Sequence, residues 1–439
     1  MSQGVPGTAP HPTFQKALVE AAGLSHSYGY CPAEGEAKLR EGLVEEMKKC
    51  VYGRDIDLKK EDIALTAGCN MAFVATIMCL ADEGDEVVLP VPWYFNHQMT
   101  LSLLGIKTVP LPTFASNGFL PSVEKCKSLL TEKTKAIVLV TPNNPTGAIY
   151  PPSLIASFAA LAHSHDIALI LDETYRDFIQ TPDLPPHKLH VPSSSTPPSS
   201  PNWRSTIVSL YSFSKSYRIP GHRLGSITAS PTFLHHVRTV LDTLQICPPR
   251  VAQLALSLPA PSPEDGDSLI LHTLRSDILA TSAALSSRHK LFRESLPSTW
   301  RLASQGGYYA FVRHPFKGKT SKEVCRRLAI EMGVTVLPGS FFCEEKIPEA
   351  AQGINAGEIG EKAAEKINEV FSGAHRVQVM DVVDEVANGV TGKELVELEG
   401  EEEDRWVRFS VANVDDEKVK KVCERLKESE EIFGWDIDC

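Results

Sequence analysis

The most informative stretch of this chain reads YSFSK at residues 211–215 and continues with GHRLG at residues 221–225. An apolar run typical of a buried strand precedes it, and Lys215 comes just after the end of that run. Ser212 stands three residues before the lysine, and Arg223 stands eight residues after it. A lysine is nucleophilic only as the neutral amine, so this chemistry requires a desolvated side chain on rigid backbone.

The groups on either side of Lys215 suit a phosphate. The hydroxyl of Ser212 and the guanidinium of Arg223 are both good phosphate ligands. A nucleophilic lysine between phosphate ligands indicates an aldehyde cofactor that carries a phosphate, which is pyridoxal 5'-phosphate. The alternative is a solvated lysine at the end of a strand, which a short Ser-x-Ser-Lys motif does not exclude by itself.

Alternating strand and helix patterns predict the fold of the middle of the chain. Four apolar runs are typical of strands buried on both faces, at residues 87–89, 136–140, 167–171 and 207–208. Residues 151–162 begin with proline and have apolar positions at helical spacing. This alternation predicts an α/β fold with a mostly parallel sheet flanked by helices.

Unusual polar motifs follow directly on three of these strands. They are NPTG at residues 144–147, DETY at residues 172–175 and SFSK at residues 212–215. Parallel strands bring their carboxyl ends to one edge of the sheet, where open α/β sheets bind ligands. We therefore expect the three motifs to line one crevice.

Taken together, these motifs resemble those of the class I/II aminotransferases, which are fold-type I pyridoxal-phosphate enzymes. The resemblance extends from Gly4 to about Ala412. It implies an aminotransferase that moves an amino group between an L-amino acid and a 2-oxo acid through a Schiff base at Lys215. It also implies a large cofactor-binding domain with a seven-stranded sheet at residues 31–282, and a smaller α+β domain formed by residues 1–30 and 283–439.

The resemblance assigns roles to the residues at the strand ends. Asp172 would pair with the pyridine nitrogen and keep it protonated, because an ion pair favours the charged forms of both partners. The hydroxyl of Tyr175 and the amide of Asn144 would hydrogen-bond the phenolic oxygen of the ring. Without the resemblance, Asp172 would be interpreted as a helix cap and Tyr175 as a core tyrosine.

Other segments supply further cofactor contacts by the same resemblance. Tyr94 would stack on the pyridine ring, and His97 would be a hydrogen-bond donor behind Asp172. A helix pattern begins after Gly68, so Gly68, Cys69 and Asn70 would bring backbone N–H groups and the helix dipole to the phosphate. Cys69 departs from the family pattern, which has a small hydroxyl residue there, so this contact would involve backbone only.

The substrate and the partner subunit are also assigned by resemblance. Arg408 would clamp the substrate α-carboxylate, since a guanidinium binds a carboxylate with two parallel hydrogen bonds. Asn144 and Gly4 would also contact the substrate. Tyr30 would reach the phosphate of the neighbouring subunit, which implies a homodimer. The resemblance assigns no second arginine to a side-chain carboxylate; Arg250 is a candidate only because it follows Cys247, Pro248 and Pro249 in the chain.

Composition narrows the class of protein. The 439 residues are 42% hydrophobic and 23% charged, as in ordinary globular proteins. Residues 343–404 are strongly acidic and form an insertion that has no family counterpart, whereas the rest of the chain is close to neutral. We find no basic stripe for nucleic acid, no membrane segment and no signal peptide. Residues 181–205 hold seven prolines and six serines, which predicts a surface loop.

The ten cysteines are scattered without metal-ligand spacing, which predicts no metal site and a reducing, cytoplasmic location. Two other functions remain open. One is a pyridoxal-phosphate lyase that uses the same site for β-elimination, such as carbon–sulfur cleavage. The other is a non-catalytic relative, which would be expected to lose Lys215, Asp172 or Arg223.

Overall fold

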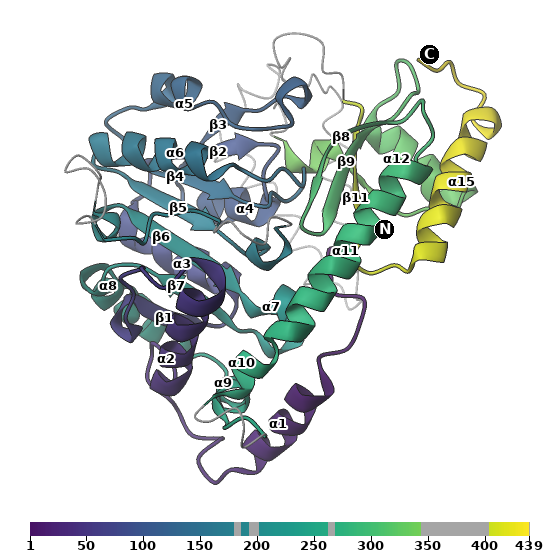
Figure 1. Cartoon of the computed structure of the whole chain (residues 1–439). Helices are drawn as coiled ribbons and strands as arrows, with labels where there is room; N and C mark the ends of the chain where they lie inside the picture. The colour runs from purple at the N-terminus through teal and green to yellow at the C-terminus, as the bar shows by residue number, and fades with distance from the viewer. Residues whose placement is uncertain (180–185, 193–201, 262–267, 344–403, 439) are drawn as a thin grey trace, which may run out of the picture. The chain divides into compact units, whose positions relative to one another are not determined.

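A seven-stranded sheet organises the larger part of the chain (Figure 1). This computed structural model describes residues 1–179, 186–192, 202–261, 268–343 and 404–438. The sheet order is β1-β7-β6-β5-β4-β2-β3. Its strands are β1 (Ile63–Thr66), β2 (Glu86–Val91), β3 (Lys107–Pro112), β4 (Thr134–Val140), β5 (Ala168–Asp172), β6 (Ile207–Ser212) and β7 (Gly225–Thr228).

The pairing within this sheet confirms the predicted fold class. Strands β3, β2, β4, β5 and β6 run parallel to one another, and β7 is antiparallel to both β6 and β1. All four runs predicted as strands lie in the sheet, and residues of β4, β5 and β6 are buried almost throughout. Near-continuous apolar strands of this kind fit a sheet that is covered on both faces.

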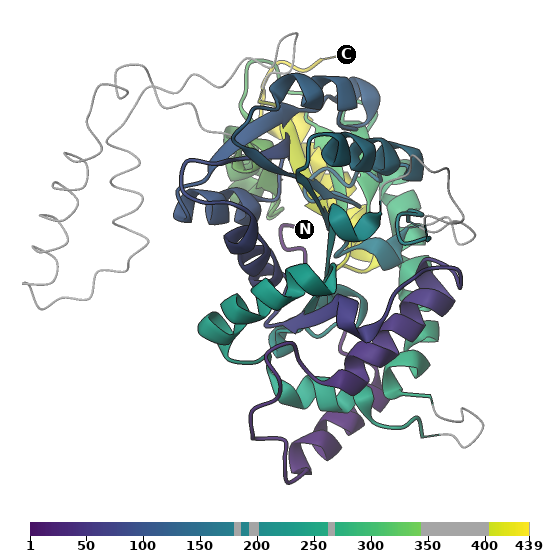
Figure 2. The same ribbon diagram turned by 90° about the vertical axis from the view of Figure 1, so that its left-hand side faces the viewer.

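Helices cover the sheet on both sides. Helix α3 packs against α4 and α8, and α5 packs against α6 (Figures 1 and 2). Their bounds are α3 (Cys69–Leu80), α4 (Phe95–Leu103), α5 (Val123–Leu129), α6 (Pro152–Ser164) and α8 (Pro231–Gln245). As predicted, α6 begins at a proline, which has no N–H to leave unpaired at the start of a helix.

A second, antiparallel sheet has the order β10-β11-β9-β8. Its strands are β8 (Arg301–Gly306), β9 (Tyr309–Arg313), β10 (Leu337–Pro338) and β11 (Trp406–Ser410). The nearby helices are α11 (Arg275–Ser295), α12 (Ser321–Glu331) and α15 (Asp416–Ile432). The N-terminus joins this sheet, because the Met1 carbonyl accepts a hydrogen bond from the Ser410 N–H at 2.7 Å.

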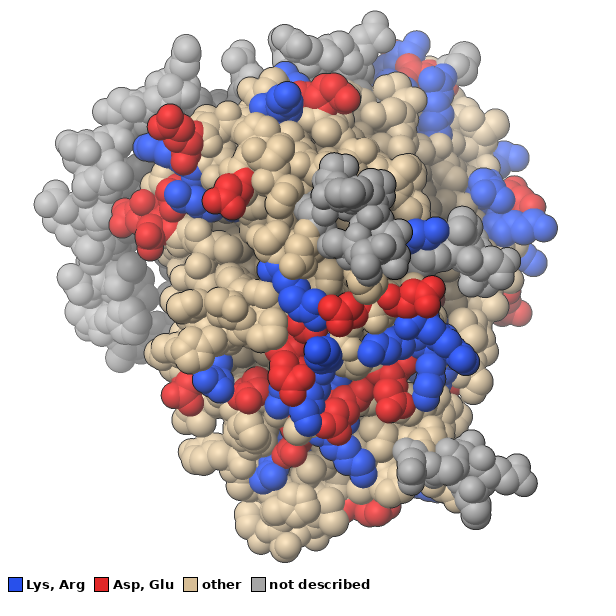
Figure 3. All heavy atoms as spheres, turned by 60° about the vertical axis from the view of Figure 1, so that its left-hand side comes forward, with Lys and Arg blue, Asp and Glu red and all other residues tan. Residues whose placement is uncertain are grey.

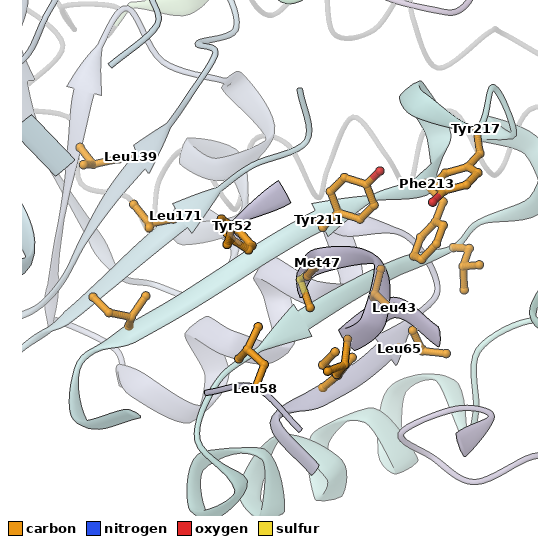
Figure 4. Packing of buried hydrophobic residues seen from close by; sticks show 14 of the residues in the cluster. Leu43, Met47, Tyr52, Leu58, Leu65, Leu139, Leu171, Tyr211, Phe213 and Tyr217 are labelled. Carbon is orange, nitrogen blue, oxygen red and sulfur yellow. The ribbon is translucent and has the colours of Figure 1, made fainter. Parts of the chain in front are cut away.

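The hydrophobic core of the described residues falls into two clusters. The first surrounds the large sheet, where Leu139 and Leu171 point from neighbouring strands (Figure 4). The second includes Phe292 and Phe409 beside the small sheet. Phe14 of α1 (Pro12–Gly23) belongs to the first cluster. The division into domains at residues 31 and 283 stays a prediction.

The acidic insertion at residues 343–404 and the proline- and serine-rich segment at residues 181–205 are described only in part. Residues 344–403 of the acidic insertion lie outside the described residues. Within 181–205, His187, His190 and Trp203 are buried rather than solvated. Both histidine rings pack on Tyr52, at 4.8 and 5.0 Å between ring centroids. These three side chains are therefore packed, whereas Lys188, Asn202 and Ser205 are exposed, and the surface loop stays a prediction.

Acidic and basic side chains are interspersed on the face of the molecule shown in Figure 3. Among the described residues, no helix combines the length and the apolar character that crossing a bilayer requires.

Leu139 offers a test of the core. Leu139 of β4 is fully buried, whereas Leu103 at the end of α4 is 85% exposed. We expect Leu139→Ala to lower the free energy of unfolding by about 2–5 kcal/mol, because it removes buried methyl groups and leaves a cavity. Leu103→Ala should change it by less than about 0.5 kcal/mol. Urea denaturation of both variants measures this, and equal midpoints would contradict the packing.

Candidate active site

A cavity of about 430 Å³ lies at the carboxyl ends of β4, β5 and β6. Its lining includes the predicted residues Gly4, Cys69, Asn70, Tyr94, Asn144, Asp172, Tyr175, Ser212, Lys215, Arg223 and Arg408. The strand-end motifs therefore share one crevice, as expected from a parallel sheet. Most of the residues that the sequence pattern singled out lie together here.

Lys215 is held on a single helical turn directly after β6. Helix α7 (Phe213–Ser216) begins where Ser212 accepts a hydrogen bond from the Ser214 N–H at 3.2 Å. The Lys215 ammonium donates to the carbonyl oxygen of Gly4 at 2.6 Å. Burial lowers the pKa of Lys215 to about 8, and the nearby cations of Arg408 and Arg223 add to this effect. Its environment therefore favours the neutral, nucleophilic amine.

Asp172 ends β5 and is buried. Its Oδ1 accepts hydrogen bonds from the N–H and the hydroxyl of Thr174, at 3.0 and 2.6 Å. Its Oδ2 lies 3.3 Å from Nε2 of His97, whose ring stacks on Phe73. The carboxylate thus makes local turn contacts and lines the cavity, but it does not cap a helix, because the following 3-10 helix Arg176–Phe178 has Tyr175 at its N-cap.

The beginning of α3 and Arg223 form a cradle for an anion. Gly68 has a φ of +87°, and a Cβ placed there would lie 2.4 Å from Nη2 of Arg223. Glycine therefore lets the guanidinium approach the N-terminus of α3 closely. Backbone N–H groups at a helix N-terminus, together with a guanidinium and the Ser212 hydroxyl, suit a phosphate.

Cys69 contributes to this cradle through its backbone. Its half-buried side chain lies 4.0 Å from Oδ1 of Asp172 and 3.7 Å from the hydroxyl of Thr174. Burial raises the pKa of the Cys69 thiol well above its ordinary value, and the Asp172 carboxylate raises it further. The thiol is therefore neutral and is directed toward Asp172.

Arg408 reaches the cavity from β11 of the small sheet. It donates to Oδ1 of Asn144 at 2.9 Å and to the carbonyl oxygen of Ser2 at 2.6 Å. Its guanidinium lies over the rings of Tyr309 and Phe342, at 4.6 and 4.9 Å from their centroids. Its buried Nε has no hydrogen-bond partner among the described residues. The side chain is therefore fixed in place and keeps a donor free.

Two residues singled out in the sequence lie elsewhere. Tyr30 is 78% exposed and does not line the cavity. Arg250 donates to Glu36 at 2.7 Å and to the carbonyl oxygens of His26, Gly29 and Tyr30. Its guanidinium is therefore engaged in holding the segment that carries Tyr30, and it does not line the cavity.

Sequence reasoning missed Tyr309 and Thr174. The Tyr309 hydroxyl lies 2.8 Å from the hydroxyl of Tyr175, and its ring supports Arg408. The signal for Tyr309 was the apolar run at residues 308–312, which forms β9 and pairs with the strand that carries Arg408. The signal for Thr174 was its spacing two residues after Asp172, which is typical of a side-chain turn.

Gly68 offers a test of the cradle with a matched control. Gly53 has a similar φ of +98°, but nothing lies within 4 Å of a Cβ placed there. We expect Gly68→Ala to weaken binding of pyridoxal 5'-phosphate at least about tenfold, which is about 1.4 kcal/mol, because the methyl group displaces Arg223. Gly53→Ala should strain the backbone similarly but leave affinity unchanged. Absorbance titration measures both, and equal affinities would contradict the cradle.

Known proteins share this architecture. The family model described as aminotransferase class I and II matches residues 1–349. The arginine–pyruvate transaminase of Pseudomonas aeruginosa is 28% identical over 336 residues, which cover 76% of this chain and 79% of that protein. The aspartate aminotransferase of Pyrococcus abyssi is 28% identical over 329 residues, covering 73% and 77% of the two chains.

The fold extends beyond the matched range. The structure of an aromatic aminotransferase from Pyrococcus horikoshii superposes with a TM-score of 0.74 and 22% identity, over 98% of this chain and 95% of that one. Arg408 lies outside the family match, so its place in the site rests on geometry alone. Because the family match covers residues 1–349 and the lysine, the carboxylate and the anion cradle share one cavity, the chain belongs to the class I and II aminotransferases, which depend on pyridoxal 5'-phosphate.

Proposed function

We propose that Lys215 is the nucleophile and proton carrier in the transfer of an amino group between an L-amino acid and a 2-oxo acid. The observation that carries this is the environment of Lys215, where burial and two cations lower its pKa to about 8. Bound pyridoxal 5'-phosphate would supply an aldehyde to take up the amino group and a ring that withdraws electrons. The other roles below belong to residues of this chain.

Each charged group in the cavity has a separate task in this proposal. Asp172 keeps the pyridine nitrogen protonated, and His97 orients its carboxylate at 3.3 Å. Arg223, with the start of α3 and Ser212, holds the phosphate. Arg408 binds the substrate α-carboxylate, and Lys215 Nζ accepts the Cα proton of the substrate as a general base and returns it as an acid.

The uncharged groups complete the site. When the cofactor is bound, Tyr175 and Asn144 would donate to its phenolic oxygen, and Tyr94 would support the ring. Gly4 contributes backbone beside the substrate, consistent with its carbonyl oxygen lying 2.6 Å from Lys215 Nζ. A lyase using these residues is not favoured, because the named relatives are aminotransferases.

We also propose a homodimer and a cytoplasmic location. Tyr30 is exposed on its own subunit, as expected for a side chain that completes the site of a partner. The nine described cysteines are all free thiols, as expected in a reducing compartment.

Removing Lys215 tests its role. We expect Lys215→Ala to lower the transamination rate at least about 10²-fold, because the general base is lost. The exposed Lys49 provides a control, and Lys49→Ala should match the parent. The assay pairs a panel of L-amino acids with pyruvate or 2-oxoglutarate, and it also measures ammonia released from a single substrate. Ammonia release without transamination would favour the lyase, and an active Lys215→Ala variant would exclude this lysine.

Mixed dimers test the role of Tyr30. A Tyr30→Phe chain and a Lys215→Ala chain should each be impaired, and their mixture should partly recover activity if Tyr30 acts on the partner's site. One site of the mixed dimer would then contain both defects and the other neither. Sedimentation should give twice the chain mass of 48.1 kDa. No recovery after proven subunit exchange would assign Tyr30 to its own chain or to no site.

A further inference from the structure

We propose that Asp177, a buried carboxylate outside the cavity, is a positioning residue that fixes the helical turn carrying Lys215. It lies in the 3-10 helix Arg176–Phe178, which follows β5 and its site residues Asp172 and Tyr175. Asp177 is not among the residues that line the cavity. The proposal rests on the proposed role of Lys215, but it concerns how the side chain is held rather than the reaction.

The carboxylate of Asp177 holds both ends of the turn. Its Oδ2 accepts a hydrogen bond from the Tyr211 hydroxyl at 2.7 Å and another from the Ser216 hydroxyl at 2.6 Å. Tyr211 lies on β6 before the turn, and Ser216 is its last residue. Lys215 lies between these two anchors, so its backbone is fixed from the side that does not line the cavity.

Two arginines keep this carboxylate charged. Arg275 at the start of α11 donates to Oδ1 of Asp177 at 2.5 Å, and the guanidinium of Arg176 lies 3.9 Å over the ring of Tyr211. Burial alone would raise the pKa of Asp177, but Arg275, Arg176 and the two hydroxyl groups outweigh it and hold the pKa below its ordinary value. Charged acceptors make the stronger hydrogen bonds, so an ionised Asp177 holds the turn firmly.

A second acid extends this network. Oε2 of Glu46 accepts a hydrogen bond from the hydroxyl of Tyr217, two residues after Lys215, at 2.7 Å. Burial and the neighbouring Asp177 raise the pKa of Glu46 to about 7, so it is not a permanent charge. Asp177 is therefore the stable anchor of the two. A displacement of about 1 Å in a reacting group can lower the rate on the order of 10²-fold. An anchor that fixes the turn therefore matters for the position of Lys215.

The test measures Lys215 itself rather than turnover. In the full-length protein freed of cofactor, the rate at which acetic anhydride labels Lys215 is followed against pH by peptide mass spectrometry. The parent should titrate near pH 8. In Asp177→Asn we expect this midpoint to rise by about one unit, because a loosened turn lets the amine reach water. A merely electrostatic effect would have the opposite sign, since removing a negative charge disfavours the protonated amine.

Asp62 provides the matched control. It is also a buried carboxylate paired with an arginine, accepting from Arg204 at 2.7 and 2.8 Å, but it precedes β1 at the opposite edge of the sheet. Asp62→Asn should destabilise the protein and leave the Lys215 midpoint unchanged.

If Asp177→Asn does not fold, a double variant tests whether Asp177 positions the turn that carries Lys215. Tyr211→Phe with Ser216→Ala keeps the Asp177–Arg275 pair but releases both ends of the turn, and it should raise the midpoint in the same direction. An unchanged or lowered midpoint in the folded variants would overturn the proposal. Failure of the proposed function is recognised separately, by the absence of a borohydride-stable cofactor adduct at Lys215 in the parent.

Discussion

The constraint on which the rest of this site depends is that a lysine must give up its proton inside a protein at neutral pH. At its ordinary pKa of 10.5, about one lysine in three thousand is neutral at pH 7, whereas at about 8 the fraction is about one in ten. Burial is the largest cause of this lowering of the pKa, Arg408 and Arg223 add to it, and the carboxylate of Asp172 opposes it. A parallel sheet suits the task, because strands β4, β5 and β6 end together at the edge where Lys215 and Asp172 line the cavity.

Sequence patterns could predict the parts of the site that lie next to strands. Asn144, Asp172 and Lys215 each follow an apolar run, so the strand periodicity also predicted which edge they share. Local signals of this kind depend only on neighbours in the chain. Tyr309 was missed for the opposite reason: its partner Tyr175 lies 134 positions away in the chain, just after β5 of the other sheet. Only the pairing of β9 with β11 brings Tyr309 beside Arg408.

Packing between distant segments accounts for the other differences. The polar composition of residues 181–205 indicated a solvated loop, yet His187 and His190 are buried against Tyr52. Composition does not reveal that an aromatic ring far along the chain will cover them. Whether such a segment is buried depends on tertiary contacts, which can outweigh the preference indicated by its local composition.

The concentration of positive charge in the cavity also affects how the protein is stabilised. Among its described lining residues, Lys215, Arg223 and Arg408 face a single carboxylate, Asp172. Positive charges enclosed together repel one another. An anion bound in the cavity therefore reduces the repulsion among these three side chains. Folding and occupancy are then thermodynamically linked: a ligand at about one hundred times its dissociation constant contributes about 2.7 kcal/mol. The concentration of phosphorylated cofactor therefore affects the fraction of chains that are folded.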